Sequence, residues 1–320
     1  YASEQMATRQ EGQGGDADIL RTRHAAFFAE AAHRWGEELK GSSQQETIRA
    51  MDADRDNLRV AWEWMATSDQ PALIDRAMDG LLSFYEWRGT LQTAEHTCRL
   101  ARKELESTAS LSQPQTLARL LTWHARFLRL LGHVEEARDL LDRGLSMLDG
   151  SDKTDAYAVN ALATVLGELS TLIKDFDRDR SCHLRQQSLA LFRQVDNRSA
   201  MATALRRRGE LAADMGDFAA ANRFLEESLT LARDLGDRRA VAAVLRSMAT
   251  AYATHGMLAR SQALSRQAIA IHEELGDTYR ACMGRLEQAS SMAYAGQFRQ
   301  AYTLFEEVAT GFDELGAQVP

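Results

Sequence analysis

The 320-residue sequence predicts an all-α solenoid, in which about six antiparallel helix hairpins stack with a period of about 40 residues. Two recurring landmarks carry the prediction. A turn glycine followed two residues later by an apolar residue recurs at Gly216, Gly256 and Gly296. A Leu-Gly pair recurs with the same period at Leu235, Leu275 and Leu315. Two independent landmarks that share one period indicate a repeat architecture.

The composition supports helix throughout the chain. Leu, Ala, Glu, Arg and Gln are abundant, and these residues are strong helix formers. Only three prolines occur, at positions 71, 114 and 320. Hydrophobic residues make up 45% of the chain, which is enough for a packed core.

Residues 1–68 differ from the repeats. We expect residues 1–17 to form a flexible segment, because they end in the glycine-rich run Glu11–Asp16. Residues 18–68 are expected to form a helical pair. Its first helix, Ile19–Leu39, carries Leu20, Phe27 and Trp35 near the α-helical period, and its second spans about Gln45–Ala66.

Residues 69–320 are expected to form the six hairpins. Each hairpin reads as a helix, a tight turn in which glycine adopts the left-handed conformation, and a second helix. The turn positions are Gly89, Gly132, Lys174, Gly216, Gly256 and Gly296. An apolar residue that we expect to act as an anchor follows two residues later, at Leu91, Val134, Phe176, Phe218, Leu258 and Phe298. A small residue follows three positions after the anchor, except that Ser181 takes this role after a two-residue insertion in the Lys174 unit.

These motifs resemble the tetratricopeptide repeat, whose pattern includes L-G-x2-Y and A-x3-F over about 34 residues. Leu166-Gly167 matches the first element, and Ala221 with Leu225 or Ala301 with Phe305 matches the second. The motif's Trp and closing Pro are absent. We expect the longer period to come from the second helix, which would span Asp217–Leu235.

A second resemblance lies in the N-terminal helices. His24–Phe28 and Asp52–Trp62, with the core Asn57-Leu58-Arg59 and a later Trp64, are similar to the block that opens the repeats in bacterial signal-transduction ATPases with numerous domains (STAND). This resemblance implies that the chain is the sensor arm of a larger regulator. Its partners would then be a protein, peptide or small-molecule inducer and an upstream nucleotide-binding domain of the same parent. The alternative is a free-standing peptide receptor, similar to the tetratricopeptide quorum sensors that hold short peptides in their concave side.

The resemblance to tetratricopeptide repeats also implies where a ligand would bind. In such repeats the first helix of each hairpin lines a concave groove. The expected groove residues are Trp87, Thr122, Arg126, Arg129, Thr164, Glu168, Arg206, Glu210, Arg246 and Thr250. Arg206 and Arg246 are equivalent positions of adjacent repeats, and guanidinium groups suit carboxylate or phosphate ligands. The alternative is that Arg206 only pairs with Glu210 one helical turn away, and that Trp87 packs in the core.

The sequence contains no motif for catalysis, so we expect neither an enzyme nor a cofactor. It has no phosphate-binding loop, no H-E-x-x-H and no G-x-S-x-G motif. The three cysteines form no C-x-x-C pair, and the acidic series Asp52–Glu63 lacks the glycine that a calcium loop requires, so no metal site is expected. The net charge of −8 argues against nucleic acid and anionic membranes as partners. We expect no apolar run near 18 residues and therefore no segment that spans a membrane. A cytoplasmic location is expected.

Overall fold

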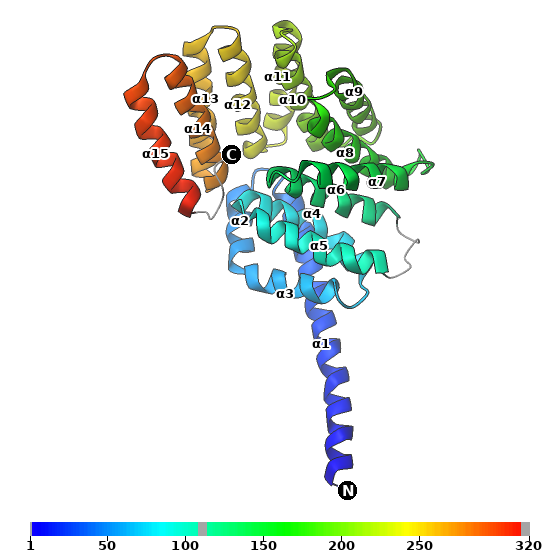
Figure 1. Cartoon of the computed structure of the whole chain (residues 1–320). Helices are drawn as coiled ribbons and strands as arrows, with labels where there is room; N and C mark the ends of the chain where they lie inside the picture. Colours follow the sequence, from blue (N-terminus) through cyan, green and yellow to red (C-terminus); the bar gives the residue numbers. More distant parts are fainter. Residues whose placement is uncertain (1, 108–113, 315–320) are drawn as a thin grey trace.

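The computed structural model describes residues 2–107 and 114–314, and within these residues it contains fifteen helices and no strand. The helices form a stack of hairpins that curves from the N-terminal helices around to α15 (Figure 1). The predicted all-α solenoid is therefore confirmed. The helix bounds are α1 Ala2–Glu38, α2 Gln44–Ala53, α3 Arg55–Met65, α4 Pro71–Arg88, α5 Leu91–Ser107, α6 Pro114–Leu130, α7 Val134–Leu148, α8 Ala156–Ile173, α9 Arg178–Gln194, α10 Arg198–Asp214, α11 Phe218–Asp234, α12 Arg238–Thr254, α13 Leu258–Glu274, α14 Thr278–Tyr294 and α15 Phe298–Glu314.

The last three hairpins show how the repeat is built. Each of the six helices α10 to α15 has 17 residues, so both helices of a hairpin have the same length. The expectation that only the second helix is lengthened was therefore wrong. Short turns connect successive helices: in Leu235–Asp237, Gly236 has a φ of 70° and Asp237 caps the next helix by accepting from the Ala240 amide. The last Leu-Gly landmark, at Leu315, lies outside the described residues.

The hairpin of α8 and α9 accommodates the predicted insertion. Helix α8 has 18 residues, and the turn that connects it to α9 is one residue longer than the turns of the later hairpins. Ser181 is fully buried and donates to the Ser170 carbonyl, as expected of the small position. Phe176, however, is 83% exposed, and Leu258 and Phe298 are also exposed. The expectation that these three residues act as anchors was wrong: Phe176 lies in the turn before α9, and Leu258 and Phe298 are the exposed first residues of α13 and α15.

The N-terminal helices depart from the sequence prediction at three places. Helix α1 begins at Ala2 instead of near Ile19, since glycine lowers helix propensity but does not forbid a helix. The expected second helix is divided at Asp54 into α2 and α3. Phe27 is 67% exposed, and its neighbour Phe28 is buried instead.

The division at Asp54 lets α2 and α3 contact different neighbours. Gln45 of α2 donates to the Glu274 carbonyl at the far end of the array. Trp62 of α3 donates to the Thr97 carbonyl of α5. One straight helix could not make both contacts, so tertiary packing determines where the helix breaks.

Helices α1 and α4 make the closest approach in the N-terminal region. An added Cβ at Gly80 would lie 1.8 Å from the Ala32 carbonyl oxygen, and one at Gly36 would lie 2.9 Å from the Gly80 Cα. Only hydrogen atoms fit at these positions. The contact fixes α1 against the first hairpin and joins it to the main core, which includes Trp35 and Phe84.

The two ends of the array contact each other, so the superhelix closes into a ring (Figure 1). We call this contact the clasp, formed by Gln44, Glu86 and Arg88 on the N-terminal side and by Asp237, Gly276 and Arg280 on the other. Gln44 donates to the Asp237 carboxylate at 2.6 Å. Arg88 donates to the Gly276 carbonyl at 2.9 Å, and Arg280 pairs with Glu86 at 2.8 Å.

Helix α8 is long and apolar enough to cross a membrane by length and composition, and it is the one such helix among the described residues. The expectation that no apolar segment reaches this length was therefore wrong. In the structure 67% of this segment is buried inside the array. Core helices that are covered on most sides have the same composition.

Replacing Gly80 with Ala is expected to destabilise the protein by at least about 1–3 kcal/mol, because the new Cβ collides with backbone that cannot rotate away. The measurement is the free energy of unfolding in urea. Gly144→Ala in α7 is the control, since its Cβ would lie at an ordinary 3.6 Å from the nearest atom and should add about 1 kcal/mol of helix propensity. Equal stability of Gly80→Ala and wild type would contradict the close approach.

Asp196→Gly is expected to stabilise the protein by about 0.5–1 kcal/mol. Asp196 has a φ of 49°, and the equivalent residues of the next two repeats, Gly236 and Gly276, take the same left-handed conformation. Asp196→Ala should destabilise, because alanine has the steric cost of this conformation without the local polar compensation. The measurement is the melting temperature of both variants. If both substitutions shift it in the same direction, the left-handed conformation of Asp196 is not what limits stability at this position.

Candidate functional site

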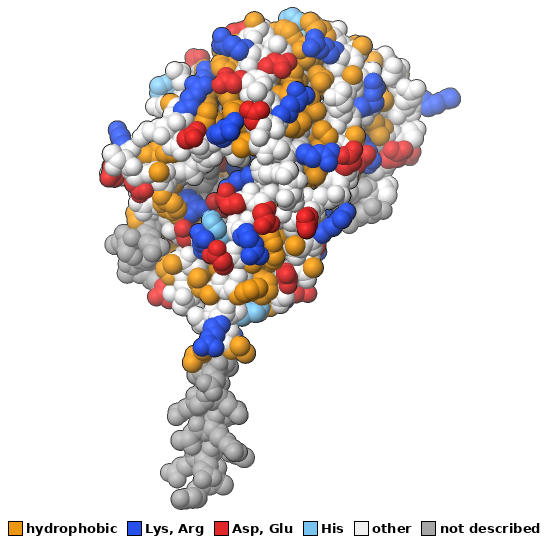
Figure 2. Space-filling model, turned by 180° about the vertical axis from the view of Figure 1, so that it is seen from behind, with side chains coloured by type: hydrophobic (Ala, Val, Ile, Leu, Met, Phe, Trp, Pro, Cys, Tyr) orange, Lys and Arg blue, Asp and Glu red, His pale blue; other side chains and the backbone are white. Residues whose placement is uncertain are grey.

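The curved array encloses a groove of about 1030 Å³. Residues from the first helices of the hairpins, α4, α6, α8, α10, α12 and α14, form most of its wall. Basic, acidic and apolar side chains intermingle on the outer face seen in Figure 2, without one dominant patch of a single sign. The groove is therefore the feature of the molecule best suited to enclose a ligand.

The structure brings the predicted site residues together along this groove. Nine of the ten line it: Trp87, Thr122, Arg126, Arg129, Thr164, Arg206, Glu210, Arg246 and Thr250. The tenth, Glu168, lines a side cavity of about 130 Å³ whose wall shares Arg126 and Thr164 with the groove. Contact of these residues with a ligand remains a prediction.

The predicted basic stripe is paired with carboxylates, most of them from neighbouring repeats. Arg126 donates to Glu86 at 3.2 Å and to Glu168 at 2.6 Å. Arg206 pairs with Glu210 in its own helix, as the local alternative predicted. Arg246 pairs with Glu287 of the next repeat at 2.8 Å. Guanidinium and carboxylate groups thus form a ladder of ion pairs along the wall. Several of these pairs connect one repeat to the following one.

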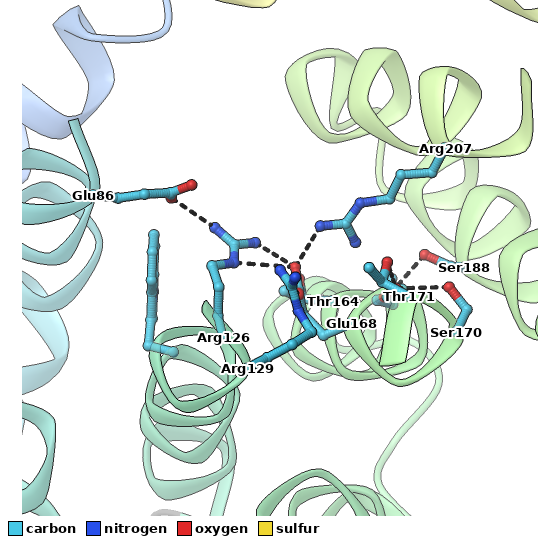
Figure 3. Close-up of polar contacts among 12 residues, drawn as sticks. Glu86, Arg126, Arg129, Thr164, Glu168, Ser170, Thr171, Ser188 and Arg207 are labelled. Atoms are coloured by element: carbon cyan, nitrogen blue, oxygen red, sulfur yellow. Dashed lines mark hydrogen bonds and ion pairs between the residues drawn. The ribbon is translucent and has the colours of Figure 1, made fainter. Parts of the chain in front are cut away.

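The centre of this ladder is Glu168 of α8, which is 1% exposed. Arg126 and Arg129 reach it from α6, and Arg207 reaches it from α10, as Figure 3 shows. Burial by itself would raise the pKa of the Glu168 carboxyl, but these three arginines hold the pKa far below its usual value. This buried carboxylate with several donors ties three consecutive first helices together.

Other carboxyl groups of the groove have lowered pKa values for the same reason. Burial opposes ionisation of Glu86, but Arg126 and Arg280 lower its pKa from 4.5 to about 2. Burial likewise opposes ionisation of Glu210, whose pKa Arg206 and Arg246 lower to about 2. Both carboxylates are charged at neutral pH.

Asp277, beside the clasp, has a lowered pKa as well. Burial opposes its ionisation, but the Arg239 guanidinium outweighs burial and lowers the pKa of Asp277 to about 2. Arg239 donates to this carboxylate at 2.7 Å. The charged pair therefore holds the first residues of α12 against the turn before α14.

The two tryptophans of the first hairpins are packed. Trp87 is 2% exposed, and the Arg239 guanidinium lies 4.7 Å from its ring centroid. Trp123 stacks on Phe127, and its indole N–H donates to Asp79 at 2.9 Å. The packing alternative is therefore correct for Trp87, although its edge borders the groove.

Basic side chains outnumber acidic ones on the groove wall, although the chain as a whole carries a net charge of −8. Eleven Lys and Arg residues line the groove against six Asp and Glu residues, and Glu168 in the side cavity adds a seventh carboxylate. Charge complementarity favours a ligand that carries negative charge.

Sequence reasoning missed Arg185, Arg207, Arg239 and Arg280, which also line the groove. Arg207, Arg239 and Arg280 lie on first helices, but at positions that were not among the expected groove residues. Arg185 lies on a second helix, but one sequence signal could have identified it. It occupies the last position of the A-x3-F pattern that begins at Ser181, where the repeat calls for an apolar residue.

The comparisons with known proteins support the tetratricopeptide interpretation. The sequence model of the tetratricopeptide repeat matches residues 200–274, which cover most of α10 to α13. Among curated proteins no sequence matches the chain. Together with the repeated hairpins, the match establishes that the chain is an α-solenoid of the tetratricopeptide-repeat type.

Three solved structures share this fold at low sequence identity. Aspartyl phosphate phosphatase F from Bacillus subtilis has a TM-score of 0.64 at 11% identity, over 100% of this chain and 78% of that one. A Rap protein complexed with Competence and Sporulation Factor has a TM-score of 0.53 at 10% identity, over 91% and 99%. A signal transduction ATPase with numerous domains and a tetratricopeptide repeat sensor, from Pyrococcus horikoshii, has a TM-score of 0.52 at 14% identity, over 88% and 45%. This chain thus corresponds to less than half of the ATPase.

Stability is expected to fall as the pH drops from about 4.5 to about 2, because the lowered pKa values of Glu86 and Glu210 are absent in the unfolded chain. These carboxylates stabilise the fold fully above pH 4.5, and protonation removes the contribution, on the order of 3 kcal/mol for Glu86. Urea unfolding measured across this pH range tests the prediction. A free energy of unfolding that stays constant from about pH 7 to about pH 3 would contradict it.

Glu168→Gln is expected to destabilise the protein by about 3–5 kcal/mol, since it leaves Arg126, Arg129 and Arg207 around an uncharged group. The measurement is the melting temperature at neutral pH. Glu227→Gln is the control, because Glu227 forms a single ion pair with Arg193 in which both side chains are about half exposed, and such pairs contribute about 1 kcal/mol or less. Similar shifts for both variants would mean that the Glu168 cluster adds little to stability.

Proposed function

We propose that this chain is a ligand-binding sensor domain of a STAND-type signal-transduction regulator, and that a protein segment, peptide or small molecule binds in its concave groove. The domain has no catalytic role in this proposal. The observation that carries it is the enclosed groove, whose wall combines many charged and polar side chains with apolar ones. A wall of this kind can donate many directed hydrogen bonds to a ligand.

The N-terminal helices support the STAND assignment. Their sequence resembles the block that opens the repeats in this class, and the Pyrococcus horikoshii ATPase has a tetratricopeptide sensor of the same fold. In the proposal, α1 connects the sensor to an upstream nucleotide-binding domain. Gly36 and Gly80 fix α1 against the first hairpin, so a movement of the ring would reach α1 directly.

The closed ring suggests how binding is transmitted. The clasp joins α4 to α14 through Glu86 and Arg280, and both residues line the groove. A ligand that contacts both sides favours the closed ring over an open one, and the difference in its affinity for the two states sets the size of the response. Binding in the groove and the position of the N-terminal helices are therefore coupled in the proposal.

The alternative is a free-standing peptide receptor of the quorum-sensing type. Its support is the fold shared with the Rap protein that was crystallised with Competence and Sporulation Factor. The region encoded upstream of Tyr1 distinguishes the two functions. A phosphate-binding loop in that region supports the STAND regulator, and a reading frame that begins close to Tyr1 supports the receptor.

Blocking the groove tests the common part of both functions. A thermal-shift screen with short peptides and charged metabolites identifies compounds that raise the melting temperature, as any ligand of the folded state must. Thr250→Trp places an indole in the groove and is expected to abolish the shifts. Thr230→Trp is the control, since both threonines are exposed and donate to the carbonyl four residues earlier, but Thr230 lies outside the groove.

The two variants give opposite expectations. Compounds that bind in the groove stabilise wild type and Thr230→Trp but leave Thr250→Trp unchanged. If every compound that shifts wild type shifts Thr250→Trp equally, binding occurs elsewhere and the groove is not the sensor site.

A further inference from the structure

One arginine of the groove differs from the others in its surroundings. Nine arginines line the groove, and eight of them form an ion pair with a carboxylate. The ninth, Arg185 of α9, forms no ion pair with a carboxylate among the residues that the structure describes, although it is only 3% exposed. It donates to the backbone carbonyl of Arg207, and its Nε has no hydrogen-bond partner in the described part of the chain.

The position of Arg185 makes its charge unexpected. It takes the last place of the A-x3-F pattern, which in three other hairpins is held by Cys98, Leu141 and Leu225, each at most 2% exposed. An apolar side chain would pack here at no electrostatic cost. A buried guanidinium without an ion-pair partner is instead unfavourable, because it loses hydration without a compensating charge. The fold therefore carries a charge that its own stability does not require.

The environment keeps this charge unbalanced. Burial is the main cause that lowers the pKa of Arg185 to about 10. The Glu210 carboxylate offsets part of this shift, and the positive charges of Arg207 and Arg206 add to it. Arg185 still carries its proton at neutral pH. Of the carboxylates near Arg185, Glu168 binds three other arginines and Glu210 binds Arg206 and Ser247. Asp214 also acts on Arg185, but it is exposed and forms no ion pair with it.

Arg185 also lies where two cavities meet. Together with Arg207 and Thr203 it lines both the groove and the side cavity of about 130 Å³. The side cavity is also lined by Thr164, Ser188 and Glu168, and the charge of the Glu168 carboxylate is balanced by its three arginine partners. Its size suits a single carboxylate or phosphate group, while the remainder of a ligand would occupy the larger groove. Figure 3 shows the neighbouring part of this site, where Arg207 points from α10 toward Glu168.

We propose that Arg185, together with the adjoining Arg207, binds the anionic group of the groove ligand, a carboxylate or a phosphate that enters the side cavity. This inference rests on the proposed function of the groove and adds the chemical class of its ligand. The planar guanidinium of Arg185 offers donors in a fork that matches both anions. The anion supplies the counter-charge that the fold lacks at this position.

The test compares the response of the protein to inorganic phosphate and to acetate with its response to chloride at the same ionic strength. The melting temperature of wild type should be higher in phosphate, in acetate or in both than it is in chloride. The anion that raises the melting temperature more identifies the anion class of the ligand. Arg185→Leu restores the apolar residue of the repeat, so the variant should fold with equal or greater stability. It should bind the effective anion roughly 10- to 100-fold more weakly.

Two further variants isolate the role of the guanidinium. Arg185→Lys keeps the charge but loses the fork, so its affinity for the anion should lie between those of wild type and Arg185→Leu. Arg193→Leu removes an exposed arginine from the same helix, and its anion response should equal that of wild type.

An anion response that Arg185→Leu retains, or the absence of any response in wild type beyond that to chloride, would overturn the proposal. Either result is separable from failure of the groove itself. An uncharged ligand that Thr250→Trp excludes would still identify the groove as the binding site. The role of Arg185 would then be limited to its contact with the α10 backbone.

Discussion

Each hairpin of this array can bury its apolar face only against its neighbours, and this constraint shapes the whole molecule. Small residues such as Ala221 and Ser181, both fully buried, let paired helices approach closely. The outer hairpins would leave apolar surface uncovered if the array ended freely. Here the N-terminal helices cover the first hairpin through Gly36 and Gly80, and the clasp brings the last hairpins against the first.

Ring closure brings the charged side chains of the inner wall close to one another. Because the charged side chains of this wall are largely buried, they lose part of their hydration, and most of them pair with one another. The result is a ladder in which Arg126, Glu168 and Arg207 connect successive first helices. Apolar side chains of similar volume could give the wall equal stability, whereas loss of one partner leaves a buried charge unpaired and is costly. The ladder also keeps the groove polar. Stability and a surface for recognition thus come from opposite faces of the same helices.

Much of the fold could be predicted from the sequence because its signals are local. A glycine that ends one helix and an aspartate that caps the next act within a few residues, and Gly236 and Asp237 show both effects. The resemblance to tetratricopeptide repeats, in turn, selected ten candidate residues, of which nine line the groove. Reasoning from local signals failed for the start of α1 and for the break at Asp54, since the break depends on which neighbours each helix contacts.

The sequence by itself determined the helical repeat and its period, because periodic spacing is a property of the chain alone. The groove-facing positions came from the resemblance of these repeats to the tetratricopeptide motif. The tertiary structure decided which of the groove arginines lack an ion-pair partner. Arg206 and Arg246 are paired, whereas Arg185, on the second helix of its hairpin, is buried without a carboxylate partner among the described residues. Ion pairing depends on distances between side chains of different repeats, and the curvature and closure of the ring set those distances.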